Sequence, residues 1–354
     1  MKMTKVILIF TSYIFLLTIG GCSREEIVGS NNNPIAINSK KGLYILSEGS
    51  MSVTGSSMLS FYDFDTAFYQ NIFRPGNLGN ASDGMIYDGS DILITEQGNF
   101  NSAGKIYRID TGGTVKQSQI VGTNPYSLCT SNSKIYVTNG PANNVSVLDF
   151  SSLATLKTIN TGIYPQEILS FNGKVFVCNT SNWGGPYDST VYVIDANADT
   201  VISRITLKRE PASIALSRSN KILVGCYSIT GYVFTIDPVT FAILDSVSLG
   251  ATGGFARDIS IDKNSDNIYF ISFANEICRL NLSTKIAEIV IHNSNPASTY
   301  YYGYIFDSKR KKHYIANART FTSNGWIHIF GFDNSLIATY STGYVPRRLM
   351  ILDN

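Results

Sequence analysis

The stretch that decides the fold runs from Lys134 to Asp149 and reads K-I-Y-V-T-N-G-P-A-N-N-V-S-V-L-D. Two short apolar runs, 135–137 and 145–148, flank a polar loop at 139–144 that contains Gly and Pro. Apolar runs of this length on either side of turn residues predict a β-hairpin. Because an isolated hairpin is only marginally stable in water, we expect this one to pack against further strands.

The second half of this pattern recurs along the chain. Seven apolar runs end in Asp or Asn, and their final residues are Asp63, Asp110, Asp149, Asp195, Asp237, Asn281 and Asp333. Successive copies are 47, 39, 46, 42, 44 and 52 residues apart. A repeat of about 40–50 residues is typical of one four-stranded propeller blade. Since Asp at the start of a turn accepts hydrogen bonds from the backbone that follows, we expect these aspartates to form turns and not to bind metal.

The two ends of the repeat region predict how the ring closes. Residues 42–46 have the character of a second strand without a first strand before it, and residues 345–352 have that of a first strand without a blade after it. If the C-terminal strand completes the first blade, two open sheet edges disappear. We therefore predict an all-β chain over residues 41–354, a single seven-bladed β-propeller of four-stranded antiparallel blades closed by its C-terminal strand.

The residues Tyr136-Val137-Thr138-Asn139 resemble the hallmark of the YVTN family of propeller repeats. Gly122-Thr-Asn-Pro125 and Gly162-Ile-Tyr-Pro165 are similar to the Gly-x-x-Pro that this family carries before the first strand of a blade. The resemblance covers about residues 120–250, while blades one, six and seven depart from the pattern. It implies a YncE-like propeller fold, and a fold does not define an activity.

The N-terminal segment predicts export. Lys2 and Lys5 precede an apolar run at 6–17, which is short for a membrane span and typical of a signal peptide. We predict a signal peptide at residues 1–21. The ending Ile-Gly-Gly-Cys resembles the bacterial lipobox, which implies a lipid on Cys22; the alternative is an ordinary cleaved signal with an incidental cysteine.

The residues after Cys22 extend this interpretation. Ser23-Arg24-Glu25-Glu26 is similar to the surface-export signal of Bacteroidetes-type lipoproteins. Residues 22–40 are polar and rich in turn formers, which predicts a flexible tether. We therefore expect an outer-membrane lipoprotein exposed at the cell surface, with its lipid anchor as the only contact with the membrane.

Charge and cysteine content exclude some functions. Removal of Lys2 and Lys5 leaves 28 − 2 = 26 basic residues against 26 acidic ones, so the mature chain lacks the basic excess that favours nucleic acid. The remaining cysteines, Cys129, Cys178, Cys226 and Cys278, each lie within an apolar run. We expect them to be buried residues without disulfide bonds.

The predicted propeller places its candidate binding surface on one face. The loops between second and third strands share a face with the connections between blades, and the former are long and unlike one another. Variable loops on a rigid scaffold are where binding usually occurs. Aromatic side chains supply contact area there, and amides and arginines supply orientation. The ligand-binding candidates are Glu48, Asn99, Phe100, Tyr126, Asn182, Trp183, Tyr187, Tyr227, Arg257, Tyr301, Tyr302, Arg319 and Arg347.

The sequence carries no convincing catalytic constellation. Its three histidines, His292, His313 and His328, form no metal-binding spacing, and no nucleophile elbow or phosphate-binding loop is present. The alternative is a metal-dependent lyase or lactonase, which would use the scattered carboxylates Glu48, Asp83, Glu167 and Asp258. We expect no catalytic residues, metal or cofactor.

The leading hypothesis is a surface lipoprotein that binds a ligand on the loop face and passes it to a TonB-dependent outer-membrane transporter. The resemblance to YncE-like propeller lipoproteins suggests cobalamin as the ligand. A glycan is the nearest alternative, because aromatic and amide side chains also suit sugars. A protein-interaction platform of the cell envelope is a further alternative.

Overall fold

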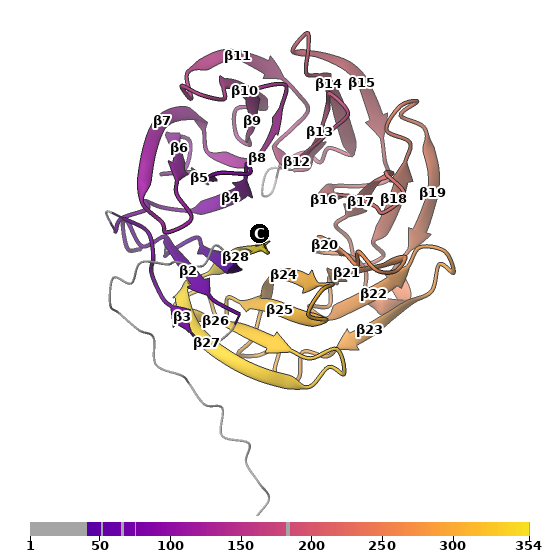
Figure 1. The fold of residues 1–354 in the computed structure, drawn as a ribbon. Helices are drawn as coiled ribbons and strands as arrows, with labels where there is room; N and C mark the ends of the chain where they lie inside the picture. Colours follow the sequence, from indigo (N-terminus) through magenta and orange to yellow (C-terminus); the bar gives the residue numbers. More distant parts are fainter. Residues whose placement is uncertain (1–40, 51, 65–66, 75, 182–184, 354) are drawn as a thin grey trace, which may run out of the picture.

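The structure, a computed structural model, describes residues 41–50, 52–64, 67–74, 76–181 and 185–353. Over these residues the chain forms seven four-stranded antiparallel sheets arranged as a ring (Figure 1). The predicted all-β, seven-bladed fold is confirmed. In this part of the chain, no helix has the length and apolar character needed to cross a membrane.

Each blade runs from an innermost strand beside the channel to an outermost strand at the rim (Figure 1). From blade one to blade seven, the innermost strands are β28 (Pro346–Leu352), β4 (Ser82–Tyr87), β8 (Pro125–Ser131), β12 (Pro165–Phe171), β16 (Pro211–Leu216), β20 (Arg257–Ile261) and β24 (Tyr301–Asp307). The second strands are β1 (Gly42–Ser47), β5 (Ile92–Glu96), β9 (Lys134–Asn139), β13 (Lys174–Asn179), β17 (Ile222–Cys226), β21 (Asn267–Ile271) and β25 (Lys312–Asn317).

The outer half of each blade is less buried. The third strands are β2 (Met58–Tyr62), β6 (Ala103–Ile109), β10 (Asn144–Asp149), β14 (Thr190–Asp195), β18 (Tyr232–Ile236), β22 (Ile277–Asn281) and β26 (Asn324–Phe330). The outermost strands are β3 (Phe68–Tyr69), β7 (Val115–Thr123), β11 (Thr155–Asn160), β15 (Thr200–Thr206), β19 (Ile243–Ser248), β23 (Ala287–Ile291) and β27 (Leu336–Tyr344). A 3-10 turn, Gly250–Thr252, follows β19.

The C-terminal strand closes the ring as predicted. β28 pairs antiparallel with β1, with Gly42 opposite Leu352 and Tyr44 opposite Met350. Blade one is therefore built from both ends of the described chain, in the order β28-β1-β2-β3. This pairing gives β1 a neighbour on both sides, so its edge is no longer open, and β28 becomes the innermost strand of the blade, as in the other six.

The hairpin at 134–149 forms strands β9 and β10, the middle pair of blade three. Tyr136 is fully buried and belongs to an apolar cluster that includes Ile168 and Val175 of blade four. Its hydroxyl donates to Asp199 Oδ1 at 2.5 Å. The hairpin is thus stabilised by the neighbouring blade, through both apolar contact and a partly buried hydrogen bond.

The recurring aspartates form turns, as predicted. Asp149 Oδ1 accepts hydrogen bonds from the backbone N–H groups of Ser151 and Ser152, at 3.1 and 2.8 Å. Asp195 and Asp237 make the same pair of contacts in blades four and five. The four cysteines at 129, 178, 226 and 278 are buried and free, which also confirms the prediction.

Candidate ligand-binding site

The innermost strands share an irregular start. In all seven blades the register between the innermost and second strands shifts there, as in a β-bulge. A bulge changes the direction of the side chains beside it, so they no longer alternate strictly between the two faces of the sheet. Each blade thereby contributes a residue near the start of its innermost strand, and these residues are Asp83, Tyr126, Gln166, Ala212, Arg257, Tyr302 and Arg347.

Threonines of the second strands hold two of these residues in place. Thr95 Oγ1 donates to the carbonyl oxygen of Tyr126 in the next blade at 2.8 Å. Thr138 Oγ1 donates to the carbonyl oxygen of Gln166 in the next blade at 2.7 Å, and it accepts the N–H of Ser127 at 3.0 Å. Thr138 belongs to the Tyr-Val-Thr-Asn motif, so this part of the motif positions backbone at the channel mouth.

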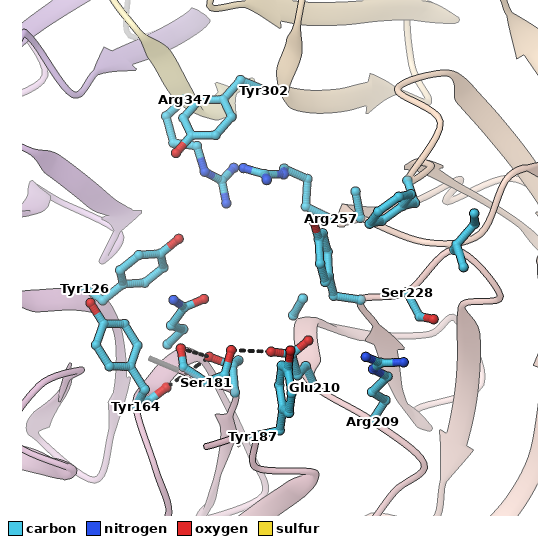
Figure 2. A pocket seen from close by; sticks show the side chains of 17 residues that line it. Tyr126, Tyr164, Ser181, Tyr187, Arg209, Glu210, Ser228, Arg257, Tyr302 and Arg347 are labelled. Carbon is cyan, nitrogen blue, oxygen red and sulfur yellow. Dashed lines mark hydrogen bonds between the residues drawn. The ribbon is translucent and has the colours of Figure 1, made fainter. Parts of the chain in front are cut away.

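A pocket of about 640 Å³ lies at this mouth. Its walls are made by starts of innermost strands, connections between blades, and loops between second and third strands, which all belong to the face predicted to bind (Figure 2). The lining residues are Tyr126, Tyr164, Gln166, Thr180, Ser181, Tyr187, Arg209, Glu210, Ala212, Tyr227, Ser228, Ile229, Ala256, Arg257, Phe273, Tyr302 and Arg347. A volume of this size is typical of small-molecule sites.

The outer wall of the pocket is aromatic. Tyr187 is 67% exposed and Phe273 is 43% exposed. The rings of Tyr227 and Phe273 contact each other with centroids 5.2 Å apart. Such rings present large apolar faces at low cost in side-chain entropy, which suits binding of a ring-containing ligand.

The rim of the pocket also carries opposite charges. Arg209 lies over the ring of Tyr187, at 5.5 Å from the ring centroid. Beside it, Glu210 is buried and accepts a hydrogen bond from the hydroxyl of Ser181 (Figure 2).

The floor of the pocket is an ion cluster that crosses the channel. Arg347 Nη1 donates to both carboxylate oxygens of Asp258, at 2.9 and 3.0 Å. Arg348 Nη2 donates to Asp83 and to Glu167, at 2.9 Å in each case. Because the bulge at the start of β28 lets consecutive residues face the channel, Arg347 and Arg348 can bind carboxylates from three different blades.

A second cavity of about 600 Å³ lies on the other side of this cluster, and Arg347 lines both cavities. Its wall is electrically balanced. Four basic residues there, Lys263, Lys309, Arg347 and Arg348, face four acidic ones, Glu167, Asp258, Asp307 and Asp353. The loop-face pocket has a different charge, with Arg209, Arg257 and Arg347 against Glu210.

Glu48 adjoins the cluster from the end of β1. Burial raises the pKa of Glu48 to about 8, Asp83 adds to the rise, and Arg347 opposes it. The carboxyl of Glu48 therefore keeps its proton to a higher pH than an exposed glutamate does. Burial also raises the pKa of Tyr126 and of Tyr302, so both pocket hydroxyls stay protonated and are able to donate hydrogen bonds.

The four carboxylates considered for a metal-dependent enzyme do gather at the channel, but three of them are bound by arginine. Asp258 pairs with Arg347, while Asp83 and Glu167 pair with Arg348. A metal ion would have to displace these charge-assisted hydrogen bonds. Within the described ranges, no group of three or more His, Cys, Asp and Glu side chains is arranged to hold a metal ion.

Some of the ligand-binding candidates predicted from the sequence lie together at the pocket. Six of the residues chosen from the sequence line the pocket, namely Tyr126, Tyr187, Tyr227, Arg257, Tyr302 and Arg347. Asn182, Trp183 and the lipid anchor Cys22 lie outside the described residues.

Five other candidates do not line it, and these are Glu48, Asn99, Phe100, Tyr301 and Arg319. Asn99 and Phe100 are exposed elsewhere, and Arg319 stacks on Trp326 at 4.3 Å from the ring centroid. Tyr301 is buried in the apolar cluster between blades six and seven, so its ring faces protein and not the pocket.

Several residues of the pocket wall were not among the candidates predicted from the sequence. Tyr164, Arg209 and Glu210 lie in the connections that lead into β12 and β16. A usable signal was present, because Tyr164 and Glu210 directly precede Pro165 and Pro211, just as Asn124 and Val345 precede the prolines of β8 and β28. Residues on either side of these prolines occupy equivalent positions around the ring.

The fold and this pocket together define the chain as a seven-bladed β-propeller with a ligand-sized cavity on its loop face. No protein-family model matches the sequence, and no curated protein matches it. The known proteins that it resembles are therefore solved structures.

Three of these structures illustrate the likeness. A quinoprotein alcohol dehydrogenase-like protein from Bacteroides thetaiotaomicron aligns with a TM-score of 0.69 at 16% identity, over 88% of this chain and 78% of the other. A hypothetical selenium-binding protein from Sulfolobus tokodaii aligns with a TM-score of 0.66 at 10% identity, over 91% and 96%. BamB from Moraxella catarrhalis aligns with a TM-score of 0.53 at 16% identity, over 88% and 84%. At such identities the likeness shows the propeller fold alone.

Proposed function

We propose that this protein captures a small organic molecule in the loop-face pocket and presents it to an outer-membrane transporter. One observation carries the proposal: five tyrosines from different parts of the ring, at positions 126, 164, 187, 227 and 302, converge on one cavity of about 640 Å³. Each tyrosine offers an apolar ring face and a hydroxyl group. This combination favours an amphipathic ligand of moderate size.

The cellular setting of the proposal comes from the N-terminal sequence. The Ile-Gly-Gly-Cys ending at Cys22 supports a lipid anchor, and the acidic pair Glu25-Glu26 supports export to the cell surface. A lipid-anchored propeller on a polar tether is held close to the membrane, where it has a high effective concentration near a transporter. A TonB-dependent receptor is the proposed partner.

Cobalamin is the proposed first ligand to test, because the Tyr-Val-Thr-Asn motif at 136–139 resembles YncE-like propellers and suggests the cobalamin-capturing lipoproteins among them. A glycan is the second candidate. It is favoured by the exposed rings of Tyr187 and Phe273 and by the amide of Gln166 on the same pocket wall, since stacking on aromatic rings and hydrogen bonds from amides also suit sugars.

Calorimetry with cobalamin, cobinamide and a panel of neutral oligosaccharides tests the proposal. Tyr187→Ala and Tyr227→Ala should each weaken binding of the true ligand about tenfold or more, because each removes a large contact surface. Phe100→Ala is the matched control: Phe100 is 67% exposed, as Tyr187 is, but it lies outside the pocket.

Two results would count against the proposal. If no ligand class gives heat or a thermal shift at high excess, capture in this pocket fails. If Phe100→Ala weakens binding as much as Tyr187→Ala, the ligand binds elsewhere on the propeller.

A further inference from the structure

Arg257 differs from the other two arginines of the channel mouth in its partners. Arg347 and Arg348 are bound by Asp258, Asp83 and Glu167. Arg257 makes no ion pair with a carboxylate of the described residues, and its contact is the ring of Tyr302, at 4.5 Å from the ring centroid. The side chain is half-buried and lines the pocket. Stacking on an aromatic ring leaves the edges of a guanidinium free to donate hydrogen bonds.

The pocket has a net positive wall. Its charged lining residues are three arginines and one glutamate, and Arg347 is already paired with Asp258 outside this wall, so the remaining balance is 2 − 1 = +1. The single carboxylate, Glu210, already accepts a hydrogen bond from Ser181. Burial raises the pKa of nearby Glu48, which disfavours its negative charge. The pocket thus concentrates positive charge on a mature chain whose formal charge is 26 − 26 = 0 by sequence.

The geometry places donors around one empty space. Figure 2 shows the guanidinium groups of Arg257 and Arg347 directed toward each other beside Tyr302, with the hydroxyl of Tyr126 turned toward the same region. Burial and the like charge of Arg347 oppose the charge of Arg257, while Tyr302, Tyr300 and Asp258 favour it, and on balance the pKa of Arg257 is raised. An anionic group between these donors would offset the like charges of the two arginines and accept several charge-assisted hydrogen bonds.

We propose that Arg257 is the anchor for an oxyanion, a carboxylate or phosphate group carried by the pocket's ligand. Arg347 and the Tyr126 hydroxyl complete the subsite, and the organic body of the ligand lies against the Tyr227–Phe273 pair. The inference rests on the proposed function, because it specifies the chemical group by which the captured molecule is recognised.

Small anions test the subsite without knowledge of the whole ligand. Inorganic phosphate and citrate would be titrated separately at low ionic strength, with calorimetry and thermal shift as readouts, so that phosphate and carboxylate recognition are distinguished. We expect at least one anion to bind the wild-type protein and to bind Arg257→Gln about tenfold or more weakly. Arg257→Lys keeps the charge but loses the planar fork, and it should bind with intermediate affinity.

Arg218→Gln is the control, since it removes an exposed arginine charge that lies outside the pocket. It should bind the small anion nearly as well as the wild type, and circular dichroism should show all variants folded. The inference is overturned if neither anion binds the wild-type protein, or if Arg257→Gln binds as tightly as wild type.

Failure of the subsite differs from failure of the proposed function. A neutral ligand whose affinity depends on Tyr187 and is unchanged by Arg257→Gln would leave capture intact and exclude the oxyanion anchor. If phosphate or citrate binds through Arg257 but no organic ligand depends on Tyr187 or Tyr227, the subsite stands and capture of an organic molecule fails.

Discussion

Arg347 and Asp258 form an ion pair across the central channel, with the guanidinium Nη1 at 2.9 and 3.0 Å from the two carboxylate oxygens. The two residues are 89 positions apart in the sequence. Arg347 belongs to β28, the strand that closes the ring, and Asp258 to β20 of blade six. The pair therefore joins the strand that closes the ring to blade six, and it forms part of the pocket floor.

Loss of this ion pair should destabilise the protein strongly. Arg347 is only 2% exposed, and its removal leaves the carboxylate of Asp258 without its partner. Breaking a buried pair in this way costs about 3–5 kcal/mol. Urea denaturation of Arg347→Gln measures the loss. Arg218→Gln is the control, because its pair with Asp266 is exposed and should contribute at most about 1 kcal/mol. Equal stability of the two variants would contradict the prediction.

Removal of residues 346–354 should abolish stable folding. The deletion removes β28, exposes the edge of β1 and removes both arginines of the channel cluster. We expect aggregation or loss of the cooperative melting transition. Deletion of residues 353–354 alone is the control, since it leaves β28 in place and removes the partly exposed ion pairs of Asp353 with Arg310 and Lys309. A long deletion that melts like the short one would show that the ring does not depend on this strand.

The threonine of the Tyr-Val-Thr-Asn motif should contribute to stability through its hydroxyl. Thr138→Val keeps the shape of the side chain but leaves the carbonyl oxygen of Gln166 and the N–H of Ser127 without this partner. We expect a loss of about 1–3 kcal/mol in the free energy of unfolding. Thr138→Ser retains the hydroxyl and should lose clearly less. If Thr138→Val is at least as stable as Thr138→Ser, the hydrogen bonds of the hydroxyl do not account for its contribution.

Glu48 should make stability depend on pH in a defined direction. In the unfolded chain its carboxyl ionises near its ordinary pKa of 4.5, whereas in the folded protein its pKa is about 8. Between these values the unfolded state has released the proton and the folded state has not. Rising pH from about 4.5 to 8 therefore lowers the contribution of Glu48 to stability, with little change outside that window.

Glu48→Gln removes this titration. The stability of the variant relative to wild type should increase as the pH rises from about 4.5 to 8 and then remain constant. Denaturant titrations of both proteins across this range provide the measurement, and their difference cancels the other ionisable groups. A difference that is the same at every pH would contradict the raised pKa.

Much of the fold was predictable because its signals are local. The aspartate that ends each third strand sets the blade period, since Asp149 and its equivalents bond to backbone only two or three residues away. Unmatched first and second strands at the two ends predicted the closure between β28 and β1. The pocket face was also predictable, because loop length follows directly from the spacing of the strands.

Individual site residues were less predictable because exposure is decided between blades. Tyr301 and Tyr302 are adjacent, yet the first is buried between blades and the second lines the pocket. Phe100 and Tyr187 are equally exposed, but only Tyr187 lies on the pocket wall. The charged cluster was hardest to predict. Its three carboxylates come from blades two, four and six, and the two arginines that bind them come from blade one.

The sequence by itself determined the number of blades, their strand order, the turn-forming role of the aspartates and the face that carries the long loops. These features depend on residues close together in the chain, whose backbone and apolar pattern act at short range. Only the tertiary structure decided which side chains share the pocket, and that Arg257 lacks a carboxylate partner among the described residues while Arg347 has one. Ring closure brings distant innermost strands together, and electrostatic interactions depend on that distance in space and not on separation along the chain.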